Sequence, residues 1–163
     1  MLNFRKGNLV TALLEGDVDV LLHQANCQNT MGSGIAKEIK ERAPGAYLSD
    51  TLYHRFCKRN HKSMLGTYSS SRVKSKSIVI NLYGQDFYSN REIGQPDTQY
   101  WALFKALSAI KDKLKGKRVG IPKRIGCGLG GGDWDLVLHF LVVEYGDLDV
   151  YIYEYDPTEE ENQ

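Results

Sequence analysis

Cysteine is scarce in this chain, and long hydrophobic runs are missing. The three cysteines, Cys27, Cys57 and Cys127, are odd in number, lie far apart and form no CxxC pair. This spacing indicates neither a disulfide framework nor a zinc site, and it fits a reducing cytosol. No apolar run is long enough to cross a bilayer, and the opening residues MLNFRK lack the apolar core of a signal peptide. We therefore expect a cytoplasmic protein with no membrane partner, no bound metal and no cofactor.

Acidic residues are missing from residues 51–85, where the charged side chains are all basic. A solvated helix face followed by a polar turn explains this stretch more simply than a nucleic-acid surface does. Few aromatic residues lie within it for stacking on bases, and the net charge of the whole chain is only +1. Nucleic acid is therefore not an expected partner. We expect the chain to be a monomer.

The length of 163 residues is enough for one compact α/β domain and too little for two. Negative charge is concentrated at the end of the chain, where the sequence reads DPTEEENQ. We therefore predict a single domain over residues 1–155, followed by an acidic tail over residues 156–163.

Short apolar runs alternate with segments of helical period. The runs predict strands at Leu2 to Lys6, Val18 to Gln24, Leu65 to Tyr68, Ile78 to Leu82, Lys117 to Ile121 and Leu148 to Tyr155. Between them, helices are expected from a Ser33 cap to Ala43, from Ala46 to Lys58, from Thr98 to Lys113 and from Trp134 to Glu144. The last of these is apolar on nearly every side, which predicts deep packing. Strands separated by helices favour a mixed, largely parallel sheet covered on both faces.

Two glycine-bearing segments follow predicted strands. HQANCQNTMGSGIA comes after the second strand, and PKRIGCGLGGGDW comes after the fifth. Ligands of such sheets bind beyond the carboxyl ends of the strands, where bare backbone N–H groups and a helix N-terminus can hold an anion. Two such loops side by side suggest a diphosphate, although a glycine hinge without a ligand remains an alternative. No Lys-Ser or Lys-Thr follows the glycines, which excludes a Walker loop.

Gly126, Gly128 and Gly131 also match the GxGxxG pattern of dinucleotide-binding domains. That pattern is weak alone, and here it lies near the end of the chain instead of opening the fold. A Rossmann dinucleotide site is therefore not indicated.

Three segments of the sequence resemble the signatures of a known family. The segments RKGNLV, LLHQANCQNTMGSGIA and IPKRIGCGLGGGDW are similar, in this order, to the three signatures of the macro domain, an ADP-ribose-binding fold. The resemblance implies a three-layer α/β/α domain that binds ADP-ribose or ADP-ribose-1''-phosphate. It is closest to the small branch that includes ADP-ribose-1''-phosphate phosphatases. That branch is in turn similar to hydrolases that remove ADP-ribose from proteins or nucleic acid bases.

The resemblance also implies a set of ligand contacts. Asn26 would bond a distal ribose hydroxyl, or else form an Asx turn after its strand. Asn8 stands where many relatives have an aspartate that accepts from adenine, and Tyr153 or Tyr155 could lie beside that base. Lys123 and Arg124 could attract the diphosphate. The predicted ligand-binding residues are Asn8, Leu9, Ala25, Asn26, Gly32, Ser33, Gly34, Ile35, Ile125, Gly126, Cys127, Gly128, Leu129, Gly130, Gly131 and Tyr155.

Phosphate removal is the activity that we predict, with His23, Asn26 and Asp133 as catalytic residues. A histidine titrates near neutrality and Asp133 could hold the attacking water, although His23 could be a core residue and Asp133 a helix cap. The relatives that release ADP-ribose use a lysine after the fourth predicted strand and an aspartate after the Gly-Cys-Gly-Leu segment. This chain has Tyr83-Gly84-Gln85 and Gly130 at those places. Hydrolysis of a mono-ADP-ribosyl linkage and noncatalytic reading of ADP-ribose remain the alternatives.

Overall fold

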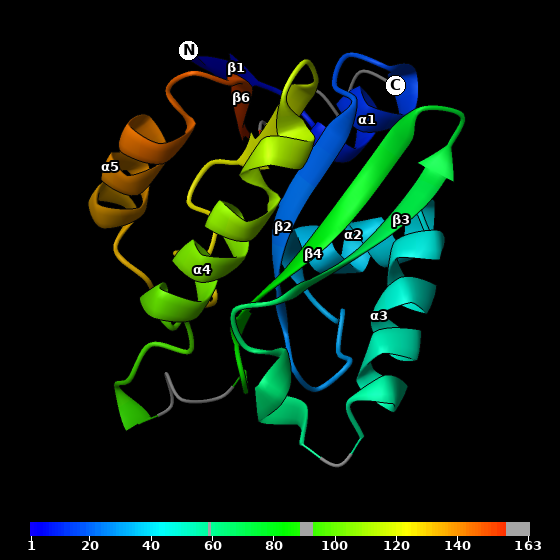
Figure 1. Cartoon of the computed structure of the whole chain (residues 1–163), viewed down its shortest axis with the longest axis vertical. Coiled ribbons are helices and arrows are strands. Elements are labelled where there is room, and N and C mark those ends of the chain that lie inside the picture. The colour runs from blue at the N-terminus through cyan, green and yellow to red at the C-terminus, as the bar shows by residue number, and fades with distance from the viewer. Residues whose placement is uncertain (59, 89–92, 156–163) are drawn as a thin grey trace.

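The computed structural model describes residues 1–58, 60–88 and 93–155, so the predicted acidic tail lies outside the described residues. A six-stranded sheet forms the centre, with the strand order β1-β6-β5-β2-β4-β3 (Figure 1). The neighbouring strands are parallel except for β3 and β4, which are antiparallel. The strands are β1 (Leu2–Lys6), β2 (Val20–Asn26), β3 (Tyr68–Lys74), β4 (Ser77–Gln85), β5 (Arg118–Pro122) and β6 (Asp149–Glu154).

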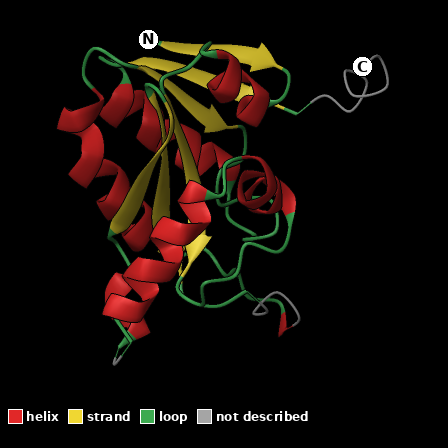
Figure 2. Cartoon of the chain, turned by 90° about the vertical axis from the view of Figure 1, so that its right-hand side faces the viewer, coloured by secondary structure: helices red, strands yellow, loops and turns green. Residues whose placement is uncertain are grey.

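Helices cover both faces of the sheet, as Figure 2 shows with the helices in red and the strands in yellow. One face carries α1 (Leu9–Glu15), α2 (Gly34–Arg42) and α3 (Gly45–Phe56). The other carries α4 (Tyr100–Ile110) and α5 (Trp134–Tyr145). Short 3-10 turns, η1 (His61–Met64) and η3 (Lys111–Leu114), follow α3 and α4. The predicted three-layer α/β/α fold with a mixed, largely parallel sheet is confirmed. No helix in the described part of the chain is long and apolar enough to cross a membrane.

The central strand β2 explains why the sheet is buried on both faces. Val20 and Leu22 pack into the cluster formed with α4 and α5, while Leu21 between them packs into the cluster formed with α1 and α2. Successive side chains of a strand point to opposite faces, so a continuous apolar run serves both layers. This arrangement fixes the carboxyl end of β2 at the rim of the sheet.

Three elements differ from the sequence-based expectation. Helix α1 was not predicted; it is one of the shortest helices, and it starts where the Asn8 side chain accepts from the Thr11 N–H at 2.9 Å. Strand β3 begins at Tyr68, where the predicted strand ended. It lies at the edge of the sheet and pairs with β4, and edge strands often carry polar and charged residues. Helix α5 is not deeply packed. It rests on the sheet by one face, so Val137 and Leu141 are buried while Val143 is 69% exposed.

Candidate functional site

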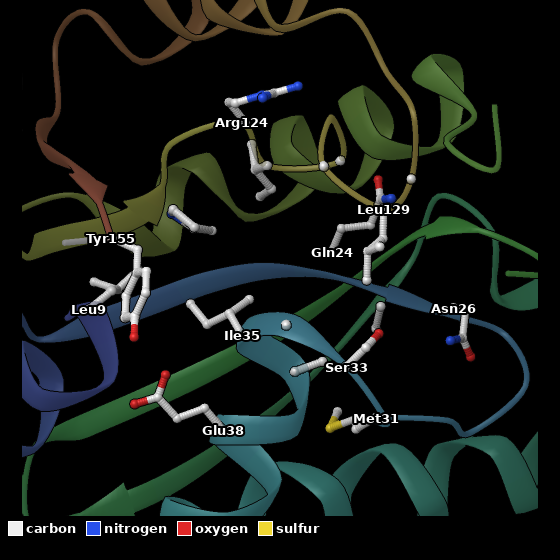
Figure 3. Close-up of a pocket in the computed structure, with 18 of the residues that line it drawn as sticks. Leu9, Gln24, Asn26, Met31, Ser33, Ile35, Glu38, Arg124, Leu129 and Tyr155 are labelled. Carbon is white, nitrogen blue, oxygen red and sulfur yellow. The ribbon is translucent and has the colours of Figure 1, made fainter. Parts of the chain in front are cut away.

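A cleft of about 1070 Å³ opens where β2, β4 and β5 end. Two loops form its sides. One, the N-terminal loop, runs from Asn26 to Gly34, between β2 and α2. The other, the glycine loop, covers residues 125–131, between β5 and α5 (Figure 3). The topology brings the two predicted segments together because β2 and β5 are adjacent parallel strands, which end at the same edge.

The cleft collects most of the predicted ligand-binding residues. All of them line it except Cys127 and Gly131. The Cys127 thiol is buried and donates to the Ile125 carbonyl at 3.2 Å, and burial raises its pKa to about 11. Gly131 has its N–H bonded to the Gly128 carbonyl at 3.1 Å. These two residues shape the glycine loop from within and do not face the cleft.

Unpaired backbone donors lie along the glycine loop. Within the described residues, the N–H groups of Gly126, Gly128, Leu129 and Gly130 donate to no protein acceptor. All four residues line the cleft. Clustered N–H groups without a partner can bind an anion, because its oxygens accept hydrogen bonds from them. A ligand without such acceptors would exclude water and leave the N–H groups unpaired, which costs binding free energy.

A second set of donors lies across the cleft at the start of α2. Ser33 is the N-cap of this helix, but its side chain makes no capping hydrogen bond. The N–H groups in the first turn of any helix have no intrahelical acceptor, and here no capping side chain replaces it. These N–H groups belong to Gly34, Ile35 and Ala36, which line the cleft. The helix end adds partial positive charge at the same place. The two loops thus present donors to one space, as a diphosphate requires.

One end of the cleft is formed by α1, α2 and the last strand. Figure 3 places Leu9, Glu38 and Tyr155 there, at the end opposite Asn26 and Leu129. The Glu38 carboxylate accepts from Asn8 Nδ2 at 2.7 Å and pairs with Arg42 at 2.7 Å. Glu38 was not among the predicted site residues, because several charged residues alternate along α2 and their pattern does not mark one carboxylate as facing a cleft.

Basic side chains beside the glycine loop make contacts of their own. Lys123 pairs with Glu154 at 2.9 Å, and Arg124 donates from Nη2 to the Cys127 carbonyl at 3.2 Å. Arg124 also has a φ of 65°, in the left-handed region that favours glycine. Both residues line the cleft, so they add positive charge near the unpaired N–H groups.

Asn26 lines the cleft, and its side chain also holds the N-terminal loop. Its Oδ1 accepts from the Gln28 N–H at 2.9 Å, and its Nδ2 donates to the Thr30 carbonyl at 2.9 Å. This is the Asx turn that the sequence left open as an alternative. The Asn26 amide therefore uses its oxygen and one of its two N–H groups to hold the loop.

His23 lies in the core, outside the cleft. It is fully buried and does not belong to the cleft lining. Its Nε2 is 2.6 Å from Asn81 Oδ1, and the Asn81 amide nitrogen donates to the Ala46 carbonyl at 3.0 Å. Because Asn81 Oδ1 can only accept, His23 Nε2 carries the proton. Burial lowers the pKa of His23, which keeps the ring neutral. The geometry does not support the predicted catalytic role, because a side chain that is fully buried and outside the cleft lining does not reach a ligand in the cleft.

Asp133 is the N-cap of α5. Its side chain accepts from the Asp135 N–H at 2.9 Å, and its own N–H donates to the Tyr100 hydroxyl at 2.8 Å. It does not line the cleft. The structure thus favours the capping alternative over the predicted catalytic role, since the carboxylate is directed to the helix end.

Several polar residues of the cleft were missed by the sequence analysis. Gln24, Gln85 and Asp97 line it at the end near Leu129 and Asn26. The Gln24 amide nitrogen donates to Gln85 Oε1 at 2.7 Å, and the Asp97 N–H donates to the Gly130 carbonyl at 2.8 Å. These residues come from two strands and an irregular segment, and no local motif links them. The pairing of β2 with β4 brings Gln24 and Gln85 together at the ends of these strands, and the segment before α4 adds Asp97.

The fold and the cleft together define a class: α/β/α domains that hold an anionic ligand between two loops at the carboxyl edge of the sheet. The model of the Macro domain family matches residues 22–141, and the chain belongs to this family.

Sequence similarity to other proteins extends over most of the chain. An uncharacterized 17.5 kDa protein of Enterobacteria phage T4 is 27% identical over 161 residues, which are 96% of this chain and 98% of the phage protein. A DNA ADP-ribosyl glycohydrolase of Mycobacterium tuberculosis is 28% identical over 155 residues. The match covers 86% of this chain but only 40% of that enzyme's length.

Solved structures share the fold. The macrodomain of Mycobacterium tuberculosis DarG has a TM-score of 0.72 and 26% identity, over 96% of this chain and 98% of that one. Thermosipho africanus DarTG, solved in complex with ADP-ribose, has a TM-score of 0.69 and 20% identity, over 96% of this chain and 42% of that one.

Proposed function

We propose that this chain binds ADP-ribose in the cleft between the N-terminal loop and the glycine loop. The observation that carries the proposal is the presence of two sets of unpaired N–H groups on the walls of one cleft. One set belongs to Gly126, Gly128, Leu129 and Gly130, and the other lies at the start of α2. The Thermosipho relative of the same fold was solved with ADP-ribose, which supports this ligand over another diphosphate.

The orientation of the ligand follows from the two ends of the cleft. Leu9 and Tyr155 offer apolar and aromatic surface for adenine, and Asn8 lies beside them. The diphosphate would lie between the two sets of N–H donors. The distal ribose would then reach the end lined by Asn26, Gln24 and Leu129.

Calorimetric titration tests the binding proposal. We expect ADP-ribose to bind more tightly than ADP, and ADP more tightly than AMP, because each added group meets more of the cleft. Gly128→Val, which inserts a side chain beside the unpaired N–H groups, should weaken all three. Equal affinity for ADP-ribose and adenosine would contradict the proposal, since it would leave the glycine loop without a role.

A second candidate function is hydrolytic release of ADP-ribose from a modified macromolecule. It is favoured by the relative named as a DNA ADP-ribosyl glycohydrolase. The lysine and aspartate of such hydrolases of the family are missing from the segment Tyr83-Gly84-Gln85 and from position 130, which is glycine, so a different group must orient water. Of the described residues, two carboxylates line the cleft, Glu38 and Asp97, and Glu38 is at the adenine end. Asp97, beside Gly130, is the candidate to orient the water.

The surface beside the cleft indicates which macromolecule could carry the ADP-ribose group. Phe87 and Tyr88 are stacked with ring centroids 4.8 Å apart, both are exposed, and Tyr88 lines the cleft. Exposed Lys62 pairs with Asp86, the residue before this aromatic pair, across 3.8 Å. Exposed aromatic rings with a lysine nearby offer a surface on which the bases of a single-stranded nucleic acid could stack. An ADP-ribosylated oligonucleotide is therefore the first substrate to test.

The hydrolysis assay compares an ADP-ribosylated oligonucleotide, a protein ADP-ribosylated on acidic side chains, and ADP-ribose-1''-phosphate. We expect release of ADP-ribose from the oligonucleotide and loss of that release in Asp97→Asn, with Glu41→Gln on the exposed face of α2 as the control. Release of phosphate alone would favour the phosphatase activity that the sequence predicted. Binding without any release would leave the chain a reader of ADP-ribose.

A further inference from the structure

A row of polar side chains lies directly behind the glycine loop. Gln24 Nε2 donates to Gln85 Oε1 at 2.7 Å and to Thr98 Oγ1 at 2.8 Å. Thr98 Oγ1 then donates to the Gly126 carbonyl at 2.5 Å. Gln24 belongs to β2, Gln85 to the end of β4, and Thr98 to the segment that precedes α4. The row therefore ties the loop to two strands of the sheet.

The other end of the glycine loop is held from the same side. The N–H groups of Asp97 and Thr98 donate to the Gly130 carbonyl at 2.8 and 3.0 Å. The carbonyl groups of Gly126 and Gly130 are thus both fixed to one short segment. Between these two anchors lie Gly128 and Leu129, whose N–H groups are unpaired and line the cleft.

The glycines at the two anchors are explained by this row. A Cβ on Gly126 would lie 2.9 Å from Gln24 Oε1 and 3.2 Å from Thr98 Oγ1. One on Gly130 would overlap Thr98 Oγ1. Gly128, in contrast, faces open space. Glycine at 126 and 130 therefore lets the backbone approach Gln24 and Thr98, whereas a Cβ on Gly128 would meet no atom of the protein.

Stability alone does not account for a glutamine at position 24. Among the described residues, its Oε1 is one of the buried side-chain atoms that have no hydrogen-bond partner. An unpaired buried acceptor destabilises a fold, and an apolar side chain of similar length would avoid that cost. What the glutamine supplies is two N–H donors, and both are directed to the row behind the loop.

We propose that Gln24 and Thr98 are positioning residues, which set the glycine loop in the conformation that presents its N–H groups to the diphosphate. The inference rests on the proposed binding of ADP-ribose in this cleft. Thr98 does not line the cleft, so its effect on the ligand would pass through the loop. Donors held in place before binding need no ordering when the ligand arrives, and affinity rises accordingly.

The test uses Thr98→Val, which removes the hydroxyl and keeps the shape, together with Thr98→Ser, which keeps the hydroxyl. We expect Thr98→Val to weaken ADP-ribose binding about tenfold, which corresponds to about 1.4 kcal/mol. Thr98→Ser should bind within about twofold of wild type. In nitrogen-15 NMR spectra of the ligand-free protein, the amide signals of residues 126–130 should shift or broaden in Thr98→Val and not in Thr98→Ser.

Thr67→Val is the matched control. Thr67 Oγ1 also donates to a backbone carbonyl at 2.5 Å, that of Met64, and Thr67 lies outside the cleft lining. It should lose comparable stability and keep the wild-type affinity for ADP-ribose. Equal weakening by both variants would overturn the inference, because general destabilisation would then explain the effect.

The outcomes separate the two proposals. If wild type does not bind ADP-ribose, the proposed function fails, and the NMR comparison still tests whether Thr98 fixes the loop. If wild type binds and Thr98→Val binds as tightly, the positioning role is overturned. Should Thr98→Val fail to fold, Gln24→Met removes the two Nε2 donors to Gln85 and Thr98 together with the unpaired Oε1. It should shift the amide signals of residues 126–130 in the ligand-free protein and weaken ADP-ribose binding.

Discussion

Asn8 Nδ2 donates to the Glu38 carboxylate at 2.7 Å, and this bond joins the start of α1 to α2 at one end of the cleft. The same carboxylate pairs with Arg42 one turn further along α2. The Asn8 Oδ1 is used as the α1 cap. Glu38 thus holds Asn8 in the orientation in which it lies beside the proposed adenine position.

Glu38→Ala is expected to weaken ADP-ribose binding by about three- to tenfold, since one charge-assisted hydrogen bond that orders the adenine end is lost. The unfolding free energy should change by about 1 kcal/mol or less, because Glu38 and Arg42 form a partly exposed i,i+4 ion pair, and such pairs contribute little to stability. Calorimetry and urea unfolding measure the two effects. Glu41→Ala, on the exposed part of the same helix, should change neither. A Glu38→Ala protein with unchanged affinity would place the base elsewhere.

Asn26→Asp separates the two sides of the Asn26 amide. The aspartate keeps the acceptor for the Gln28 N–H and loses the donor to the Thr30 carbonyl. It also places a negative charge at the distal-ribose end of the cleft, where it repels the anionic ligand, so ADP-ribose binding should fall at least about tenfold while the unfolding free energy falls by about 1 kcal/mol. Asn26→Ala, without the charge, should lose more stability and less affinity. The reverse order would contradict the loop-holding role.

Substitutions at two glycines distinguish strain in the backbone from obstruction of the cleft. Gly116 has a φ of 73° and open space around it, so Gly116→Ala should lose about 1 kcal/mol of stability through backbone strain and keep its affinity. Gly128 has open space without a positive φ, so Gly128→Ala should keep its stability and weaken ADP-ribose binding. Thermal unfolding and calorimetry on both variants check the crossed pattern. Loss of stability in Gly128→Ala would mean that its glycine serves the fold.

The sequence predicted the layers well because apolar runs and helical periods are local. The β2 residues Val20 to Leu22 show this, since three consecutive apolar side chains mark a strand buried on both faces. Strand β3 was displaced because Ser69 to Ser71 have no strand-like apolar pattern, and only its pairing with β4 makes it a strand.

The sequence predicted the two backbone loops of the site, but it did not predict the polar side chains that line or support them. Glycine-rich loops after strands indicate where N–H groups are bare, and these loops do line the cleft. In contrast, Gln24 and Thr98 are 74 residues apart along the chain, and their contact depends on the order of the strands. His23 follows the same rule: its position near Asn26 suggested a shared site, but alternation along β2 turns its side chain into the core.

The buried neutral state of His23 predicts a pH dependence of stability. Burial lowers the pKa of His23 below the ordinary value of 6.5, so the unfolded chain binds a proton that the folded chain does not. Stability is therefore present above about pH 6.5 and is lost as the pH falls below it, by at most about 1.4 kcal/mol per pH unit for this group. The pKa of His54 is also lowered, mainly by partial burial, so it adds to the same loss.

His23→Gln should flatten this dependence between pH 6.5 and the acid limit of folding, because glutamine can still donate to Asn81 and does not titrate. Urea unfolding at several pH values measures the slope, and His139→Gln, on an exposed position of α5, serves as the control. ADP-ribose affinity of His23→Gln should match wild type at pH 7.5. A large loss of affinity or turnover with an unchanged stability profile would return His23 to the chemistry of the site, because a core residue that only supports packing has no other route to that result.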